Sequence, residues 1–125
     1  MENEVVKEWI RLAEMDRETA KYLQNMRPKP IEIICFLCQQ ASEKMLKAFL
    51  VKNEKTPPKT HNLIILNNYC EELSSEFRKI KDECGRLNYY SVQPRYPDVI
   101  EILESDMQLA ISDMERIVEF VENKI

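Results

Sequence analysis

Apolar residues recur every three or four positions near both ends of the chain, which is the spacing of amphipathic helices. The first such repeat predicts a helix from about Asn3 to Asn25. Its seam is formed by Val6, Trp9, Ala13, Asp16, Ala20 and Leu23. The segment Arg27-Pro28-Lys29-Pro30 should end this helix, because proline cannot continue a helix and restricts the residue before it. One seam position is an aspartate, so this helix carries a charge toward the expected core.

The next helix, predicted from about Pro30 to Asn53, is apolar nearly all round. One face holds Ile34, Leu37, Ala41, Met45 and Ala48, and other faces hold Phe36, Leu46, Phe49 and Leu50. A helix of this kind is usually covered on more than one side. We therefore expect it to lie centrally in the domain, to form a dimer contact, or both.

Turn and capping residues predict where the helices in the middle of the chain begin and end. The loop from Glu54 to Thr60 contains Pro57-Pro58, and Thr60 or Asn62 can cap a third helix from about His61 to Leu73. Ser74 and Ser75 can cap a fourth, from about Glu76 to Tyr89 with a break near Gly85, followed by an irregular connection from Tyr90 to Asp98.

The last predicted helix reaches the C-terminus and begins near Asp98 or Ser105. Its seam is Ile100, Leu103, Met107, Ala110, Met114, Ile117 and Val121. We predict one all-α domain over residues 1–125, an up-and-down helical bundle of four to five helices.

Composition narrows the classes of function. Gly85 is the single glycine, which argues against the glycine-rich loops that cradle phosphates. The net charge of −4 argues against a general nucleic-acid coat and leaves room for a local basic site. No apolar run is long enough for a membrane span, and the acidic start Met1-Glu2-Asn3-Glu4 does not resemble a signal peptide, so we expect a cytoplasmic protein.

The four cysteines are expected to be reduced. Cys35 and Cys38 form a C-x-x-C inside an apolar stretch, but Cys70 and Cys84 do not supply a second close pair. We interpret them as core residues, with metal or redox chemistry as the alternative. We expect no metal and no cofactor.

Gln40, Lys44 and Lys47 share one face of the second helix, because they are spaced by four and three residues. A buried lysine seeks a carboxylate, and Asp16 is available on the first helix. One interpretation is an Asp16–Lys44 pair that fixes helix register. The other is a polar pocket for a phosphate, a nucleotide or a partner group, and Lys47 could also extend to solvent.

His61 is the only histidine, at the start of a predicted helix. It is either a capping or packing residue or an acid–base group, and the second role needs an orienting carboxylate.

A second cluster of candidates lies downstream. Two arginines and three tyrosines fall within eleven residues: Arg86, Tyr89, Tyr90, Arg95 and Tyr96. Arginine binds phosphate bidentately and tyrosine stacks on bases, so the cluster either binds RNA, a nucleotide or a protein, or folds back onto the bundle through its aromatic rings. No G-x-S-x-G or H-E-x-x-H motif is present.

In order along the chain, several pieces resemble the HEPN domain family, the higher eukaryote and prokaryote nucleotide-binding domains. They are Trp9-x-x-Leu12-Ala13-x-x-Asp16 with Ala20, Phe36-x-x-Gln39-Gln40-Ala41-x-Glu43-Lys44-x-x-Lys47-Ala48, Thr60-His61-Asn62-Leu63, Arg95-Tyr96-Pro97, and Ala110 in the last seam. The resemblance implies a helical bundle that often forms homodimers. It also implies a small nucleotidyltransferase as partner in a toxin–antitoxin pair.

Many members of that family are metal-independent ribonucleases in which a histidine follows an arginine after four to six residues. This sequence departs from that pattern. Lys55 is the nearest basic residue at that range before His61, and no histidine follows Arg86 or Arg95. Ribonuclease activity of the usual kind is therefore not expected.

Three hypotheses follow. The leading one is a nucleotide- or RNA-binding module that works through Asp16, Gln40, Lys44, Lys47, His61, Arg95 and Tyr96. The second is a divergent ribonuclease that uses His61 with Arg95. The third is a purely structural or protein-interaction bundle, in which Asp16, Gln40 and Lys44 only lock the helices together.

Overall fold

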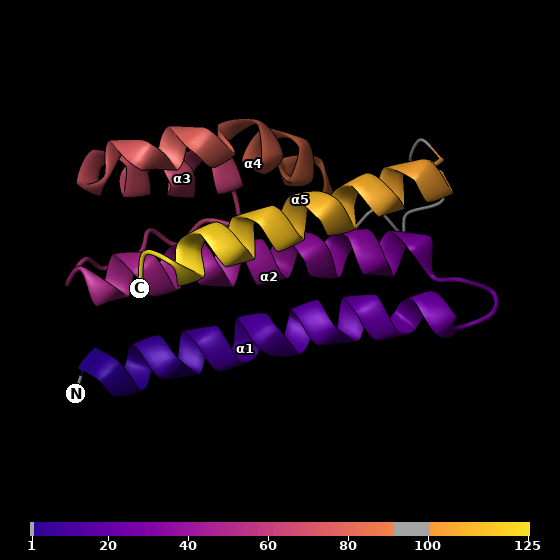
Figure 1. Cartoon of the computed structure of the whole chain (residues 1–125), viewed down its shortest axis with the longest axis horizontal. Coiled ribbons are helices and arrows are strands. Elements are labelled where there is room, and N and C mark those ends of the chain that lie inside the picture. Colours follow the sequence, from indigo (N-terminus) through magenta and orange to yellow (C-terminus); the bar gives the residue numbers. More distant parts are fainter. Residues whose placement is uncertain (1, 92–100) are drawn as a thin grey trace.

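The computed structural model describes residues 2–91 and 101–125, and there the chain forms α-helices and shorter 3₁₀ helices (Figure 1). The α-helices are α1 (Glu2–Tyr22), α2 (Ile31–Lys52), α3 (Leu63–Leu73), α4 (Lys81–Leu87) and α5 (Glu104–Glu122). These residues contain no strand. The predicted all-α bundle is confirmed.

Helix α2 is the centre of the bundle. It packs against α1 on one side and against α5 and α3 on others, and α1 runs antiparallel to it along its length (Figure 1). Thirteen of its residues are buried, in agreement with its all-round apolar pattern. The expectation of a central position is therefore confirmed. The helices at the two ends of the chain, α1 and α5, both pack against α2.

Two predicted boundaries are close to those observed. Helix α1 passes into a 3₁₀ turn over Leu23–Asn25, as the proline-rich segment after it requires. Helix α3 starts after Asn62, whose side-chain oxygen accepts hydrogen bonds from the backbone N–H groups of Ile64 and Ile65 at 2.9 and 3.1 Å. Asn62 is thus the N-cap of α3, and His61 lies immediately before it in the chain.

The predicted fourth helix is divided differently from the expectation. It consists of a 3₁₀ helix over Ser75–Ile80, helix α4, and a 3₁₀ turn over Asn88–Ser91, so the break lies at Ile80 and not near Gly85. Phe77 and Ile80 are both fully buried. A 3₁₀ helix aligns residues three apart, and this pair therefore points together into the core.

The last helix begins at Glu104, so Ser105 lies inside its first turn and is not the cap. The carboxylate of Asp106 accepts the backbone N–H of Leu103 at 2.8 Å. Leu103 itself is 54% exposed, so its predicted place in the seam is wrong, although the seam from Met107 to Val121 is buried. Asp98 and Ile100, also named in the prediction, lie outside the described residues.

The core is closed by aromatic rings and thiols. Phe77 lies between Phe49 and Phe120, with ring centroids 4.5 and 5.0 Å away. The four cysteines are buried free thiols, as expected of core residues. In the part of the chain that the structure describes, no helix has both the length and the apolar character needed to cross a membrane.

Candidate functional site

The carboxylate of Glu43 is the centre of a polar network on α2. Its side chain is only 6% exposed. The ammonium of Lys47 donates to it at 3.0 Å, and Nδ1 of His61 lies 3.0 and 3.1 Å from its two oxygens. The side-chain amides of Gln39 and Gln40 each approach it at 3.4 Å. A buried carboxylate is costly unless charges and donors surround it, and these groups meet that need.

The spacing along α2 explains why these groups meet. Gln39, Glu43 and Lys47 are four residues apart, so they form one row on the helix surface, and Gln40 with Lys44 forms the adjacent row. The amide of Gln40 joins the two rows by donating to the side-chain oxygen of Gln39 at 2.8 Å. The network is therefore built into a single rigid helix.

His61 reaches the network from the other side. The amide of Gln39 donates to the backbone carbonyl of His61 at 2.8 Å, which fixes the main chain just before the Asn62 cap. The imidazole is 73% exposed. In the neutral ring, an Nδ1–H that donates to Glu43 leaves Nε2 as an unprotonated acceptor. Glu43 is thus the orienting carboxylate that an acid–base histidine requires.

The predicted pair of Asp16 and Lys44 is present. The ammonium of Lys44 donates to the carboxylate of Asp16 at 2.7 Å and to the side-chain oxygen of Gln40 at 3.3 Å. Both charged side chains are 20% exposed. Because the pair joins α1 to α2, it fixes the register of the two helices, and it leaves Lys44 with little capacity to hold an external phosphate.

Lys47 does not extend to solvent, which was one of its expected roles. The residue is 9% exposed, and its ammonium pairs with Glu43. It also lies 5.7 Å from the ring centroid of Trp9 on α1, at cation–π distance. Its low exposure follows from these two partners.

Glu43 and Gln39 were the residues that sequence reasoning did not assign to the site. Their four-residue spacing with Lys47 was the available signal, but on the sequence alone they read as interruptions of an apolar helix. Arg95 and Tyr96 lie outside the described residues, and their expected contacts stay predictions.

The other basic and aromatic candidates are used within the fold. The guanidinium of Arg86 donates two hydrogen bonds of 2.9 Å to the buried Asp113, and this contact raises the Arg86 pKa above its usual value. Tyr90 is buried, and desolvation followed by its contacts with Cys35 raises its pKa. Tyr89 is 53% exposed and packs edge-on against Tyr90. This part of the cluster folds back onto the bundle.

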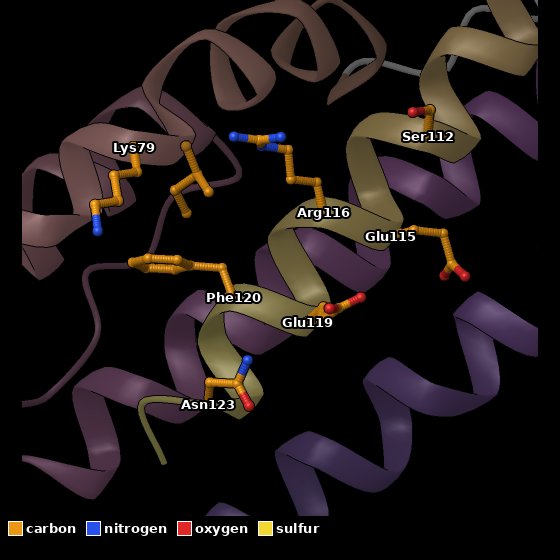
Figure 2. A pocket seen from close by; sticks show the side chains of 8 residues that line it. Lys79, Ser112, Glu115, Arg116, Glu119, Phe120 and Asn123 are labelled. Carbon is orange, nitrogen blue, oxygen red and sulfur yellow. The ribbon is translucent and has the colours of Figure 1, made fainter.

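A groove of about 520 Å³ lies between α5 and the 3₁₀ helix over Ser75–Ile80. Figure 2 shows Arg116 and Phe120 projecting from α5 toward the segment that carries Lys79. Arg116 pairs with the mostly buried Glu83 at 2.7 Å, and Glu115 binds Arg17 and Lys21. Arg116 and Glu115 are thus already paired, and neither His61 nor its polar neighbours line this groove.

The arrangement can therefore present one oriented, accessible imidazole. The other charged groups of the network hold that ring and one another in place. Among the residues that the structure describes, no three histidine, cysteine, aspartate or glutamate side chains are grouped so as to hold a metal ion.

Comparison with known proteins gives the family. The model of the HEPN domain matches residues 6–124. A crystal structure described as that of an archaeal HEPN homologue superposes with a TM-score of 0.73 at 27% identity, over 95% of this chain and 96% of that one. Comparison with curated proteins returned no match.

Proposed function

Because the chain belongs to the HEPN family, we propose that it is a nucleotide- or RNA-binding module whose ligand meets the imidazole of His61. The observation that carries the proposal is the contact of this exposed ring with the buried carboxylate of Glu43. A histidine that only packs would be expected to bury its ring. Here the ring is exposed, and a buried carboxylate, that of Glu43, holds it in place at the surface.

The loop beside His61 supplies a local positive charge on an acidic chain. Lys52 ends α2, Lys55 and Lys59 lie in the loop that follows, and all three are exposed. None of the three forms an ion pair with the described residues. Glu54 is the one acidic residue of this loop. Free lysines next to an oriented imidazole suit a ligand that carries phosphate.

The remaining predicted residues divide into two groups. Gln40 and Lys47 act in this proposal as positioning residues, because each bonds to Glu43, whereas Asp16 and Lys44 join α1 to α2. Arg95 and Tyr96 are assigned to ligand contact by the chemistry of their side chains and by the family resemblance.

Fluorescence anisotropy with a labelled single-stranded RNA oligonucleotide, and separately with labelled ATP, tests the proposal. We expect His61→Ala to weaken binding by about tenfold. Lys81→Ala is the matched control, since Lys81 is an exposed lysine on α4, and it should leave affinity unchanged. Lys59→Ala should reduce the slope of log affinity against log salt for RNA by about 0.7. Absence of binding to both probes, or equal loss in His61→Ala and Lys81→Ala, would refute the proposal.

The Glu43–His61 pair favours a second candidate, a divergent metal-independent ribonuclease. In that reaction Nε2 of His61 takes the proton of the 2′-hydroxyl, the 2′ oxygen bonds to phosphorus, and the 5′ oxygen leaves with a proton from solvent. Arg95 is the residue proposed to stabilise the phosphorane charge. Purified protein incubated with RNA at neutral pH, beside His61→Ala, separates the candidates. Cleavage that His61→Ala abolishes would support the ribonuclease. Absence of cleavage by either protein would exclude the ribonuclease, and the binding module would remain as the proposed function.

A small nucleotidyltransferase is the proposed protein partner, with a toxin–antitoxin role for the pair. This part rests on what the HEPN resemblance implies. It is tested by co-expressing the chain with a nucleotidyltransferase encoded beside it and measuring complex formation and growth. A neighbouring gene of another class, or no complex, would count against it.

A further inference from the structure

The groove between α5 and the 3₁₀ helix over Ser75–Ile80 has two walls of different chemistry (Figure 2). One wall is a face of α5, on which residues recur at spacings of three and four: Ser112, Arg116, Phe120 and Asn123. The other wall is formed by Lys79 and Ile80. From Ser112 to Asn123 the groove follows α5 for about 16 Å, the length of about three helical turns. It is therefore long enough to receive a helix of another molecule.

Phe120 and Ile80 give the groove an apolar floor. The Phe120 ring is half-buried and packs edge-on against Phe77, with the two ring centroids 5.0 Å apart. Ile80 is almost fully buried in the same core. The core thus holds the floor in place, while the uncovered part of the Phe120 ring lines the groove. An apolar side chain placed on this ring would be shielded from water, which stabilises helix–groove contacts.

Three cationic side chains surround the Phe120 ring. Lys79 and Arg116 reach the groove from opposite walls, and each side chain is 65% exposed. The ammonium of Lys124 lies 5.5 Å from the centroid of the Phe120 ring. Positive charge is therefore gathered at the edge of the apolar floor, on a chain whose net charge is −4.

Two carboxylates accompany these three cations. Glu76 pairs with Lys124, and it lies 3.5 Å from the ammonium of Lys79, which is a loose contact. The mostly buried Glu83 contacts Nε of Arg116 at 2.7 Å. The terminal nitrogens of this exposed guanidinium can still bind a further carboxylate. The cluster thus has one more cation than carboxylates, and Lys79 is the least engaged of the three.

The carboxylates that line the groove belong to its other rim. Glu115 binds Arg17 and Lys21 of α1, and Figure 2 shows the side chains of Glu115 and Glu119 projecting toward α1. At about 100° per residue, they lie on the side of the α5 face away from Phe120. The groove is therefore cationic beside its apolar floor and acidic along the rim next to α1.

We propose that this groove binds an acidic amphipathic helix of another protein. Its apolar side chains would pack on Phe120 and Ile80, and its carboxylates would meet Lys79 and Arg116. A basic helix would add charge to a cluster that already has an excess of cations. A nucleic acid would bring a phosphate backbone past the acidic Glu119 rim, whereas a helix can turn an uncharged face toward that rim.

Fluorescence anisotropy of the full chain with a labelled helical peptide tests this surface. The peptide carries leucine and phenylalanine at three- and four-residue spacing and glutamate at the flanking positions, and its analogue carries lysine in place of glutamate. We expect the glutamate peptide to bind at least about tenfold more tightly than the analogue. Lys79→Glu should weaken its binding by about tenfold. Lys81→Glu is the matched control, because Lys81 is exposed, lies two positions away and does not line the groove.

An introduced thiol locates the contact. The four natural cysteines are buried, so a cysteine at the exposed position Ser112 can be labelled selectively with an environment-sensitive dye. The glutamate peptide should shift the emission of labelled Ser112→Cys and not that of labelled Asn68→Cys, an exposed position on α3. Equal affinity for the two peptides, equal losses in Lys79→Glu and Lys81→Glu, or a shift from Asn68→Cys alone would overturn the proposal. These outcomes are independent of His61, because its network does not line the groove.

Discussion

Nδ1 of His61 lies 3.0 Å from one carboxylate oxygen of Glu43 and 3.1 Å from the other, although the two residues are 18 positions apart and differ greatly in exposure. The exposed ring and the buried acid come from different elements: the acid lies on the central helix, and the ring lies at the entry to α3. This relationship converts a lone histidine into an oriented one. It also makes Glu43 the residue whose loss should have the widest consequences.

We expect Glu43→Gln to lower the free energy of unfolding by about 3 kcal/mol, because it leaves the ammonium of Lys47 in a nearly buried site without its counter-charge. Urea denaturation measures this change. The double variant Glu43→Gln/Lys47→Met should recover much of the loss, since it removes both charges. A double variant as unstable as the sum of its two single variants would show that the pair is not coupled.

The pair of Asp16 and Lys44 should contribute less. Both side chains are 20% exposed, so we expect Asp16→Asn to lower the free energy of unfolding by about 1 kcal/mol. Lys44→Met should retain the fold and leave the affinity for labelled RNA unchanged, because we assign Lys44 to the α1–α2 contact. Loss of RNA binding by a folded Lys44→Met protein would instead assign Lys44 to the ligand.

The four thiols should be unreactive in the native protein. Burial raises the pKa of Cys35 to about 11 and that of Cys84 to about 12, and it raises the pKa of Cys38 and Cys70 as well. Because the thiolate is the reactive form, a thiol reagent at about pH 8 should modify none of them rapidly and all four after denaturation. Rapid modification of one thiol in the folded chain would contradict its placement in the core.

Glu122 should make stability depend on pH. Desolvation, followed by its contact with Glu14, raises the pKa of Glu122 above 4.5. A carboxyl with a raised folded-state pKa contributes stability below its unfolded pKa and loses it as pH rises through the folded pKa. Glu122→Gln should therefore melt at a higher temperature than the natural chain near pH 7, and the difference should shrink toward pH 4. Thermal melts at the two pH values check this, and a difference that grows on acidification would contradict it.

The helices were predictable because their signals are local. The seam of α1, the all-round apolar character of α2 and the Asn62 cap each involve residues within a few turns of one another. The boundary at Ile80 was not predictable in this way: Phe77 and Ile80 enter a core that other helices build, and that demand overrides the local preference for a longer α-helix. Leu103 was misplaced for a related reason, since only the position of Asp106 shows where α5 starts.

The candidate site shows the same division. By itself the sequence determined that Gln40, Lys44 and Lys47 share a helix face and that Asp16 could pair with Lys44, because helical periodicity fixes which residues are neighbours on one helix. Only the tertiary structure decided that Lys47 turns inward to Glu43 and that His61 meets the same carboxylate. The contact of Lys47 with Glu43 lies within α2 at a four-residue spacing, but the contact of His61 with Glu43 joins two elements across a loop. The path of that loop follows from packing and hydrogen bonds between helices, and no spacing along the chain encodes it.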